Sequence, residues 1–297
     1  MSAWEHRKVF AVVHTRSRDQ WLSFLLSGAA LVASSFSILI FIFLLLESWP
    51  VLRATSVGSF FFDESWHPTE GLFNLVPMIA GTILVVFGAV ALATPLGICL
   101  AVFQQFYAPC AMGVFMRLTM ELLAGIPSVV YGLLGIVVLV PLINQLQSPG
   151  ASLLAAMLTL ALMILPMVVV IVEADFQKIP RPYLLGAEAL GFTRWTTIKS
   201  IIFPATSGGI FAGIILQTGR AVGETMAVMM VCGNIVQVPN SLFDPMRTLS
   251  ANIALEMAYA TGNHRSALFL SGLILMTFVT LLVFVAGYLQ RIYRRVD

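Results

Sequence analysis

The chain has 297 residues, of which 59% are hydrophobic and only 10% are charged. A soluble protein of this length cannot bury so much apolar surface, so most of it must face lipid. The composition therefore excludes a soluble enzyme, and the net charge of +2 says little beside the positions of the basic residues.

Six apolar runs are long enough, or nearly so, to cross a hydrocarbon core of about 30 Å. Each must be helical, because an open strand edge in lipid leaves backbone groups unpaired, so the fold class is an all-α polytopic membrane protein. Pro95 in the second run and Pro127 in the third predict kinks or breaks. The runs lie near residues 21–46, 75–103, 122–143, 151–172, 207–231 and 266–290.

The distribution of lysine and arginine predicts the orientation of the chain. Twelve of the sixteen lie in the N-terminal tail, in the loops after the second and fourth runs, and in the C-terminal tail. The opposite loops hold only Arg53, Arg247 and Arg265, while Arg220 lies inside the fifth run. The excess on one side places both termini in the cytoplasm.

The longest loop on the predicted cytoplasmic side covers residues 173–206. Pro182 suits the first turn of a short helix over YLLGAEAL, and Gly191 is its expected C-terminal stop. The following TRWTTIKSIIF predicts a second helix that ends before Pro204. Two short helices at an angle predict a rigid knob, and a plain interfacial loop is the alternative.

The fifth run carries polar residues within ILQTGRAVGETMAVMMV, residues 215–231. On one continuous helix Gln217, Arg220 and Glu224 share a face. An unpaired arginine near the membrane midplane costs about 3 kcal/mol on insertion scales, and Glu224, four residues on, can neutralise it. The pattern favours a polar stripe that lines a pathway for an anion over a purely structural ion pair.

The third run carries small residues at helical spacing, namely Gly125, Ser128, Gly132 and Gly135. Such a stripe allows helices to approach closely, so helix packing is the favoured interpretation. Ser128 and Tyr131 are also candidates for the lining of the pathway.

Motifs for chemistry or for other ligands are missing from the sequence. No lysine lies in a P-loop, the histidines are too far apart to predict a zinc site, and no nucleophile elbow is found. We therefore expect no catalytic residue, cofactor, metal or nucleic-acid partner. If ATP drives this protein, another polypeptide binds it.

Four sequence segments carry a family resemblance. The run ALGFTRW (189–195), followed by a proline thirteen residues after its glycine, resembles the coupling loop of bacterial ABC importer permeases. Three further segments are similar to the phosphate-specific permeases of that family: GRAVGETMAVMMVCGN (219–234), TLSANIALEMAYATGNHRSALF (248–269) and LLAGIPSVVYGLLG (122–135).

The resemblance implies a type I importer permease fold with six transmembrane helices. Residues 1–70 would comprise the cytoplasmic tail, the first transmembrane helix and the first periplasmic loop. Residues 71–290 would form the permease core, with the coupling loop at 173–206. The chain would lie in the bacterial inner membrane and move inorganic phosphate, without catalytic chemistry of its own.

The resemblance also implies partners. These are a second, homologous permease, two copies of an ATP-binding subunit, a periplasmic phosphate-binding protein and membrane lipid. The family usually has a glutamate six residues before the loop glycine, where this chain has Leu185. The residues assigned to the ATPase-coupling loop are Glu188, Gly191, Arg194, Trp195 and Pro204, and which acidic residue contacts the ATPase stays open.

Three other functions are alternatives. One is a permease for a related oxyanion, and another is an ion-coupled secondary transporter with Glu224 as proton carrier. A third is an assembly factor that transports nothing. The coupling-loop pattern argues against the last two.

Overall fold

The computed structural model describes residues 16–293, with side chains described for 21–288. The expected N-terminal tail before residue 16 and the last four residues lie outside the described residues. Within them, six helices are long and apolar enough to cross a membrane, which confirms the predicted class. A single two-stranded ribbon in the described part pairs β1 (Trp66–His67) with β2 (Leu72–Phe73).

The first two spans are longer than their predicted runs. α1 continues past residue 46, and α3 passes through Pro95 without a break. A π-helical turn, η2, extends α3. The elements in this part of the chain are α1 (Arg16–Ala54), α2 (Ser59–Phe62), η1 (Pro68–Glu70), α3 (Val76–Val102) and η2 (Phe103–Tyr107).

The third predicted run is broken into separate helices. α4 (Cys110–Ala124) ends at Gly125, and α5 (Ser128–Leu134) begins after Pro127, where the break was predicted. α5 continues through the π turn η3 (Gly135–Leu139) into α6 (Val140–Leu146). The span therefore starts later than predicted, because proline disfavours a helical conformation in the residue before it.

The knob is built differently from the prediction at its second helix. α7 (Leu153–Phe176) leads into α8 (Arg181–Ala189), and α9 (Arg194–Thr197) follows. α9 does not end the helix before Pro204, since η4 (Ile198–Ile202) joins it to α10 (Phe203–Val222). The π turn widens the helix just before the proline ring, which would otherwise clash with the preceding turn.

The fifth predicted run is not one helix. α10 ends at Val222, and the chain turns through Gly223–Thr225 before α11 (Met226–Val231) begins. Glu224 therefore lies between two helices rather than on the helical face predicted for it. The chain is completed by α12 (Leu249–Glu256) and α13 (Gly262–Tyr293).

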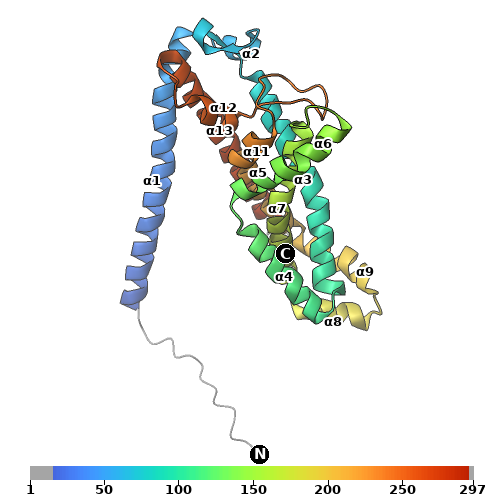
Figure 1. Ribbon diagram of the computed structural model, residues 1–297. Coiled ribbons are helices and arrows are strands. Elements are labelled where there is room, and N and C mark those ends of the chain that lie inside the picture. Colours follow the sequence, from blue (N-terminus) through green and yellow to red (C-terminus); the bar gives the residue numbers. More distant parts are fainter. Residues whose placement is uncertain (1–15, 294–297) are drawn as a thin grey trace, which may run out of the picture.

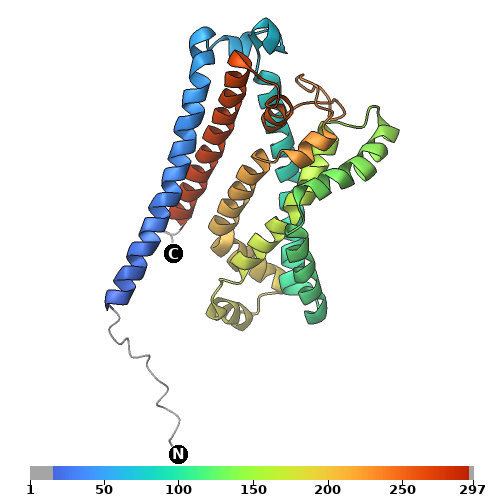
Figure 2. The ribbon, with the colours of Figure 1, turned by 60° about the vertical axis from the view of Figure 1, so that its left-hand side comes forward.

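The helices define two ends of the molecule. The loop end carries α2, α12 and the loops beside them, and the knob end carries α8 and α9 (Figure 1). α1 lies beside α13 and stands away from the other helices (Figures 1 and 2). Its most apolar stretch is 0% buried, so α1 is covered by lipid or by another subunit.

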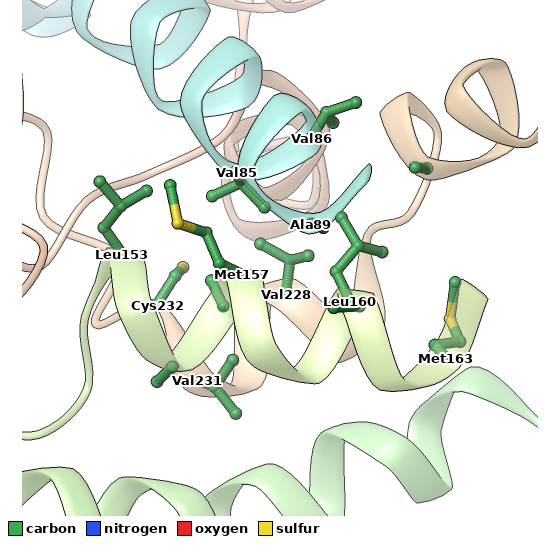
Figure 3. Close-up of a cluster of buried hydrophobic side chains, with 14 of the residues drawn as sticks. Val85, Val86, Ala89, Leu153, Met157, Leu160, Met163, Val228, Val231 and Cys232 are labelled. Atoms are coloured by element: carbon green, nitrogen blue, oxygen red, sulfur yellow. The ribbon is translucent and has the colours of Figure 1, made fainter. Parts of the chain in front are cut away.

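The largest core lies where α7 passes between α3 and α11 (Figure 3). Close approach of α3 and α7 depends on glycine, since a Cβ on Gly97 would lie 2.6 Å from Val168 Cγ1. This packing fixes α11, and with it the turn that follows α10. The labelled side chains in the core are Val85, Val86, Ala89, Leu153, Met157, Leu160, Met163, Val228, Val231 and Cys232.

Candidate functional site

Arg220 lies in the last turn of α10, near the middle depth of the helical bundle. A Cβ on the preceding residue, Gly219, would lie 3.7 Å from Val279 Cγ1, and Val279 is close to the midpoint of α13. The Arg220 side chain is exposed on the surface of the isolated chain. An exposed arginine at this depth contacts lipid, a partner subunit or a water-filled pathway.

Glu224 does not form the predicted ion pair with Arg220. The break after α10 moves its carboxylate, and Oε1 instead accepts the Ala227 N–H at 3.2 Å, which caps α11. The Glu224 carbonyl accepts the Ser250 hydroxyl at 3.2 Å. None of the ion pairs found within the described residues involves Arg220, so its charge is not neutralised by a carboxylate there.

Gln217 lies one turn before Arg220 on α10. Its Oε1 is buried and has no hydrogen-bond partner among the described residues. An unpaired buried acceptor of this kind costs about 1–3 kcal/mol. Gln217 and Arg220 therefore offer an unused acceptor and an unused cation on adjacent turns of one helix.

α5 packs directly against α11 through the predicted small-residue stripe. A Cβ on Gly132 would lie 3.0 Å from Ala227 Cα, and one on Gly135 would lie 2.7 Å from Val231 Cγ1. The helix-packing interpretation is confirmed for these two glycines. Both contacts advance in the same direction along the two helices, which puts Ser128, at the start of α5, level with the turn that holds Glu224.

Tyr131 has a structural contact in this arrangement. The residue is 9% exposed, and its hydroxyl donates to the Leu123 carbonyl at 2.9 Å. This bond ties α5 to the end of α4 across the break at Pro127. The Tyr131 hydroxyl is thereby occupied, whereas Ser128 is only half-buried and donates no hydrogen bond to another side chain in the described structure.

Replacement of Gly135 by valine should destabilise the protein. The new side chain would overlap both Val231 and Thr159, and overpacking of this kind costs about 1–3 kcal/mol. Thermal unfolding in detergent should show a lower midpoint for Gly135→Val. The matched control is Gly287→Val on α13, where a Cβ meets no described atom within 4 Å, and an equal loss in both variants would contradict the packing role.

The coupling loop has the predicted stop at its glycine. Gly191 has φ +71°, a left-handed conformation that favours glycine. Its N–H donates to the Glu188 carbonyl at 3.0 Å, and the Phe192 N–H donates to the Ala187 carbonyl at 3.0 Å. These two bonds form a Schellman motif, which fixes the angle at which the chain leaves α8.

The knob presents large apolar side chains on its surface. Leu185, Leu190 and Trp195 are 62%, 74% and 58% exposed. Glu188 and Pro204 are also exposed, so the knob combines one carboxylate with an apolar surface. Leu185 and Leu190 lie outside the six candidate spans, and an exposed apolar surface there is typical of a protein–protein contact.

The sequence did not predict two clusters of charge that form around buried carboxylates. At the loop end, Glu256 is 7% exposed and bonds Trp66 Nε1 at 2.9 Å, Arg247 Nη1 at 2.6 Å and His264 Nε2 at 2.8 Å. This cluster joins the segment between α1 and α3, which holds Trp66, and the segment between α11 and α12, which holds Arg247, to the start of α13. At the knob end, Glu173 binds Arg117 of α4. The only sequence signal for either cluster was an acidic residue among mostly apolar neighbours in the sequence.

The chain matches the family model described as "Binding-protein-dependent transport system inner membrane component" over residues 93–295. It is 35% identical to the phosphate transport system permease protein PstC of Mesorhizobium japonicum, covering 82% of this chain and 80% of that relative. It is also 35% identical to the probable ABC transporter permease protein YqgH of Bacillus subtilis, covering 90% and 89%. For PstC of Haemophilus influenzae the identity is 32%, and the match covers 82% of this chain and 84% of that relative.

Two solved structures show the same fold. A permease chain of the methionine ABC transporter MetNI, in an inward-facing conformation, aligns with TM-score 0.60 and 17% identity, covering 76% of this chain and 98% of that chain. A bacterial alginate ABC transporter, in complex with its alginate-bound periplasmic protein, aligns with TM-score 0.63 and 12% identity, covering 92% and 96%. The chain belongs to the family of binding-protein-dependent transport system inner membrane components, the multi-pass permeases of ABC importers.

Proposed function

We propose that the chain is the permease subunit of an ATP-driven importer that moves inorganic phosphate across the inner membrane. The substrate is supported by relatives named as phosphate transport permeases at 32–35% identity over most of the chain. The observation that carries the mechanism is Arg220, a cation at middle depth that no carboxylate of the described residues neutralises.

The chemistry around Arg220 suits a protonated oxyanion. A guanidinium group donates two parallel hydrogen bonds to phosphate oxygens, which a carboxylate partner would block. Hydrogen phosphate also carries a hydroxyl donor, and the unpaired Gln217 Oε1 is an acceptor on the neighbouring turn. Ser128 lies level with the turn after α10 and completes the proposed lining of the pathway.

The partners follow from the two ends of the molecule. The knob would face the cytoplasm and seat in a separate ATP-binding subunit, which would hydrolyse the ATP. The loop end would face the periplasm and receive a phosphate-binding protein, while a second, homologous permease would complete the pathway. The exposed apolar side chains on the knob support the first contact.

Uptake of labelled phosphate tests this function. Cells that lack their own phosphate transporters should take up phosphate only when this chain is produced with its permease, ATPase and binding-protein partners. A protonophore added while cellular ATP is maintained should leave the rate unchanged. Uptake by this chain alone, or collapse with the protonophore, would instead favour a secondary transporter in which Glu224 carries protons.

The proposed orientation predicts which cysteines react with an impermeant maleimide in intact cells. Phe62→Cys and Val238→Cys at the loop end should react, and Leu190→Cys on the knob should not, although the native side chains are 88%, 45% and 74% exposed. Native Cys99 and Cys110 are exposed and should first be replaced by alanine. Cys232 lies outside the six spans, and burial raises the pKa of its thiol to about 11, so it stays unreactive. The reverse labelling pattern would overturn the orientation.

A further inference from the structure

Glu173, near the end of α7, is a buried carboxylate that joins three segments of the chain. It is 4% exposed and accepts hydrogen bonds from Gln104 Nε2 at 2.6 Å and Gln177 Nε2 at 3.1 Å. Oε2 accepts from Gln104, whereas Oε1 accepts from Gln177 and also pairs with Nη2 of Arg117 on α4. Glu173 therefore connects η2, α4 and α7 at the knob end of the bundle.

α4 lies on the surface of this bundle and packs against α7. None of its fifteen residues is buried. It is preceded by the π turn η2 and followed by the break at Gly125–Pro127, so regular helix is interrupted at both ends. Such interruptions are common positions of hinges, and the second of them is spanned by the hydrogen bond from Tyr131 to the Leu123 carbonyl.

The knob touches the first of these interruptions. Arg194, at the start of α9, donates from Nη1 to the Phe106 carbonyl in η2 at 3.4 Å. The Phe106 ring packs on Phe176 of α7, with 5.5 Å between centroids, and Phe176 packs on Phe203 of α10 at 5.8 Å. These contacts connect the knob to the segment from which α4 begins.

We propose that the Arg117–Glu173 pair is a latch that holds α4 against α7, and that movement of the knob by the ATPase releases it. This inference rests on the proposed function, in which the ATP-binding subunit seats on the knob. Release is feasible because Glu173 keeps two donors, Gln104 and Gln177, when Arg117 leaves. A second arrangement, with Arg117 released from Glu173, would give α4 the two discrete states that coupling between distant sites requires.

The test measures the distance between α4 and α7 in the complete transporter in lipid nanodiscs. One spin label is placed on native Cys110 at the start of α4 and the other on Leu162→Cys, which is 42% exposed on α7, with Cys99 replaced by alanine. Double electron–electron resonance should show a longer distance in Arg117→Gln than in wild type without ATP. The ATPase rate without binding protein should rise about fivefold or more.

A charge exchange separates a latch from a merely structural contact. The variant Arg117→Glu with Glu173→Arg should restore the wild-type distance and ATPase rate, because the buried Gln104 Oε1 has no hydrogen-bond partner among the described residues and can accept from the new arginine. The matched control is Lys178→Gln, which removes an ion pair to Asp175, also a buried carboxylate, without involving α4. It should change neither quantity.

The latch is overturned if Arg117→Gln leaves the distance and the ATPase rate at wild-type values. It is equally overturned if Lys178→Gln changes them as much as Arg117→Gln does. If the exchange variant does not assemble, Arg117→Lys provides the second measurement and should keep the short distance. The distance is measured without phosphate. A result that contradicts the latch therefore leaves the assignment of phosphate as the substrate untouched.

Discussion

Replacement of Arg220 by glutamine should reduce phosphate uptake by about 100-fold, because removal of one partner from a charged bidentate contact costs about 2–5 kcal/mol. Expression and assembly with the partner subunits should stay close to wild type, since the Arg220 side chain is exposed and makes no ion pair within the described residues. Arg220→Lys should be partly active at best, because lysine keeps the charge without the planar fork. Initial uptake rates of labelled phosphate compare the wild type with Arg220→Gln and Arg220→Lys.

Glu224 separates the pathway role from a structural ion pair. If the two residues only neutralised each other, Arg220→Gln combined with Glu224→Gln would restore uptake. The structure instead uses Glu224 Oε1 to cap α11, and a glutamine oxygen can accept the same Ala227 N–H. Glu224→Gln alone should therefore keep most of the activity, and the double variant should stay inactive. Arg265→Gln, which removes an exposed arginine over the Phe269 ring, is the matched control and should transport normally.

Replacement of Gly191 by valine should uncouple the permease from its ATPase. A β-branched residue at φ +71° strains the turn by about 1–3 kcal/mol, which would displace the exposed apolar side chains on either side of it. The protein should still insert, but its affinity for the ATP-binding subunit should fall about tenfold or more. Co-purification and ATPase stimulated by the binding protein measure the effect.

Two variants sharpen this test of the knob. Gly186 lies within α8, and a Cβ there meets nothing within 4 Å, so Gly186→Val adds the same side chain without strain. It should couple normally. Gly191→Asn should be intermediate, because asparagine tolerates the left-handed conformation better than valine does. Equal coupling in all three variants would contradict a rigid knob.

The local backbone signals were predictable from the sequence, and the contacts between distant segments were not. Six spans follow from composition, because only helices satisfy the backbone in lipid. Gly191 follows from helix-capping chemistry, and the break at Pro127 follows from the missing N–H of proline. The match to the relatives confirms the importer permease family and agrees with the phosphate assignment made from sequence motifs.

The errors in the candidate site have one physical cause. The predicted helical face assumed that one helix continues through Gly223, but α10 ends there. Packing of α11 against α5 and α7 directs the turn between α10 and α11 instead. Glu224 consequently caps a new helix instead of facing Arg220. The pairing of Arg117 with Glu173, across 56 positions of sequence, likewise requires the bundle to be assembled first. Tertiary packing decided each of these contacts.

The most direct test of the central claim is the number of phosphate ions imported per ATP hydrolysed. It is measured in proteoliposomes that contain the complete transporter and binding protein, with ATP supplied on the knob side. The wild type should move phosphate into the compartment that the knob faces, at a constant number of phosphate ions per ATP hydrolysed. Arg220→Gln should hydrolyse ATP while the number of phosphate ions per ATP stays near zero. A wild-type transporter that hydrolyses ATP without moving phosphate, or an Arg220→Gln variant with an unchanged ratio, would contradict Arg220 as the phosphate contact in the pathway.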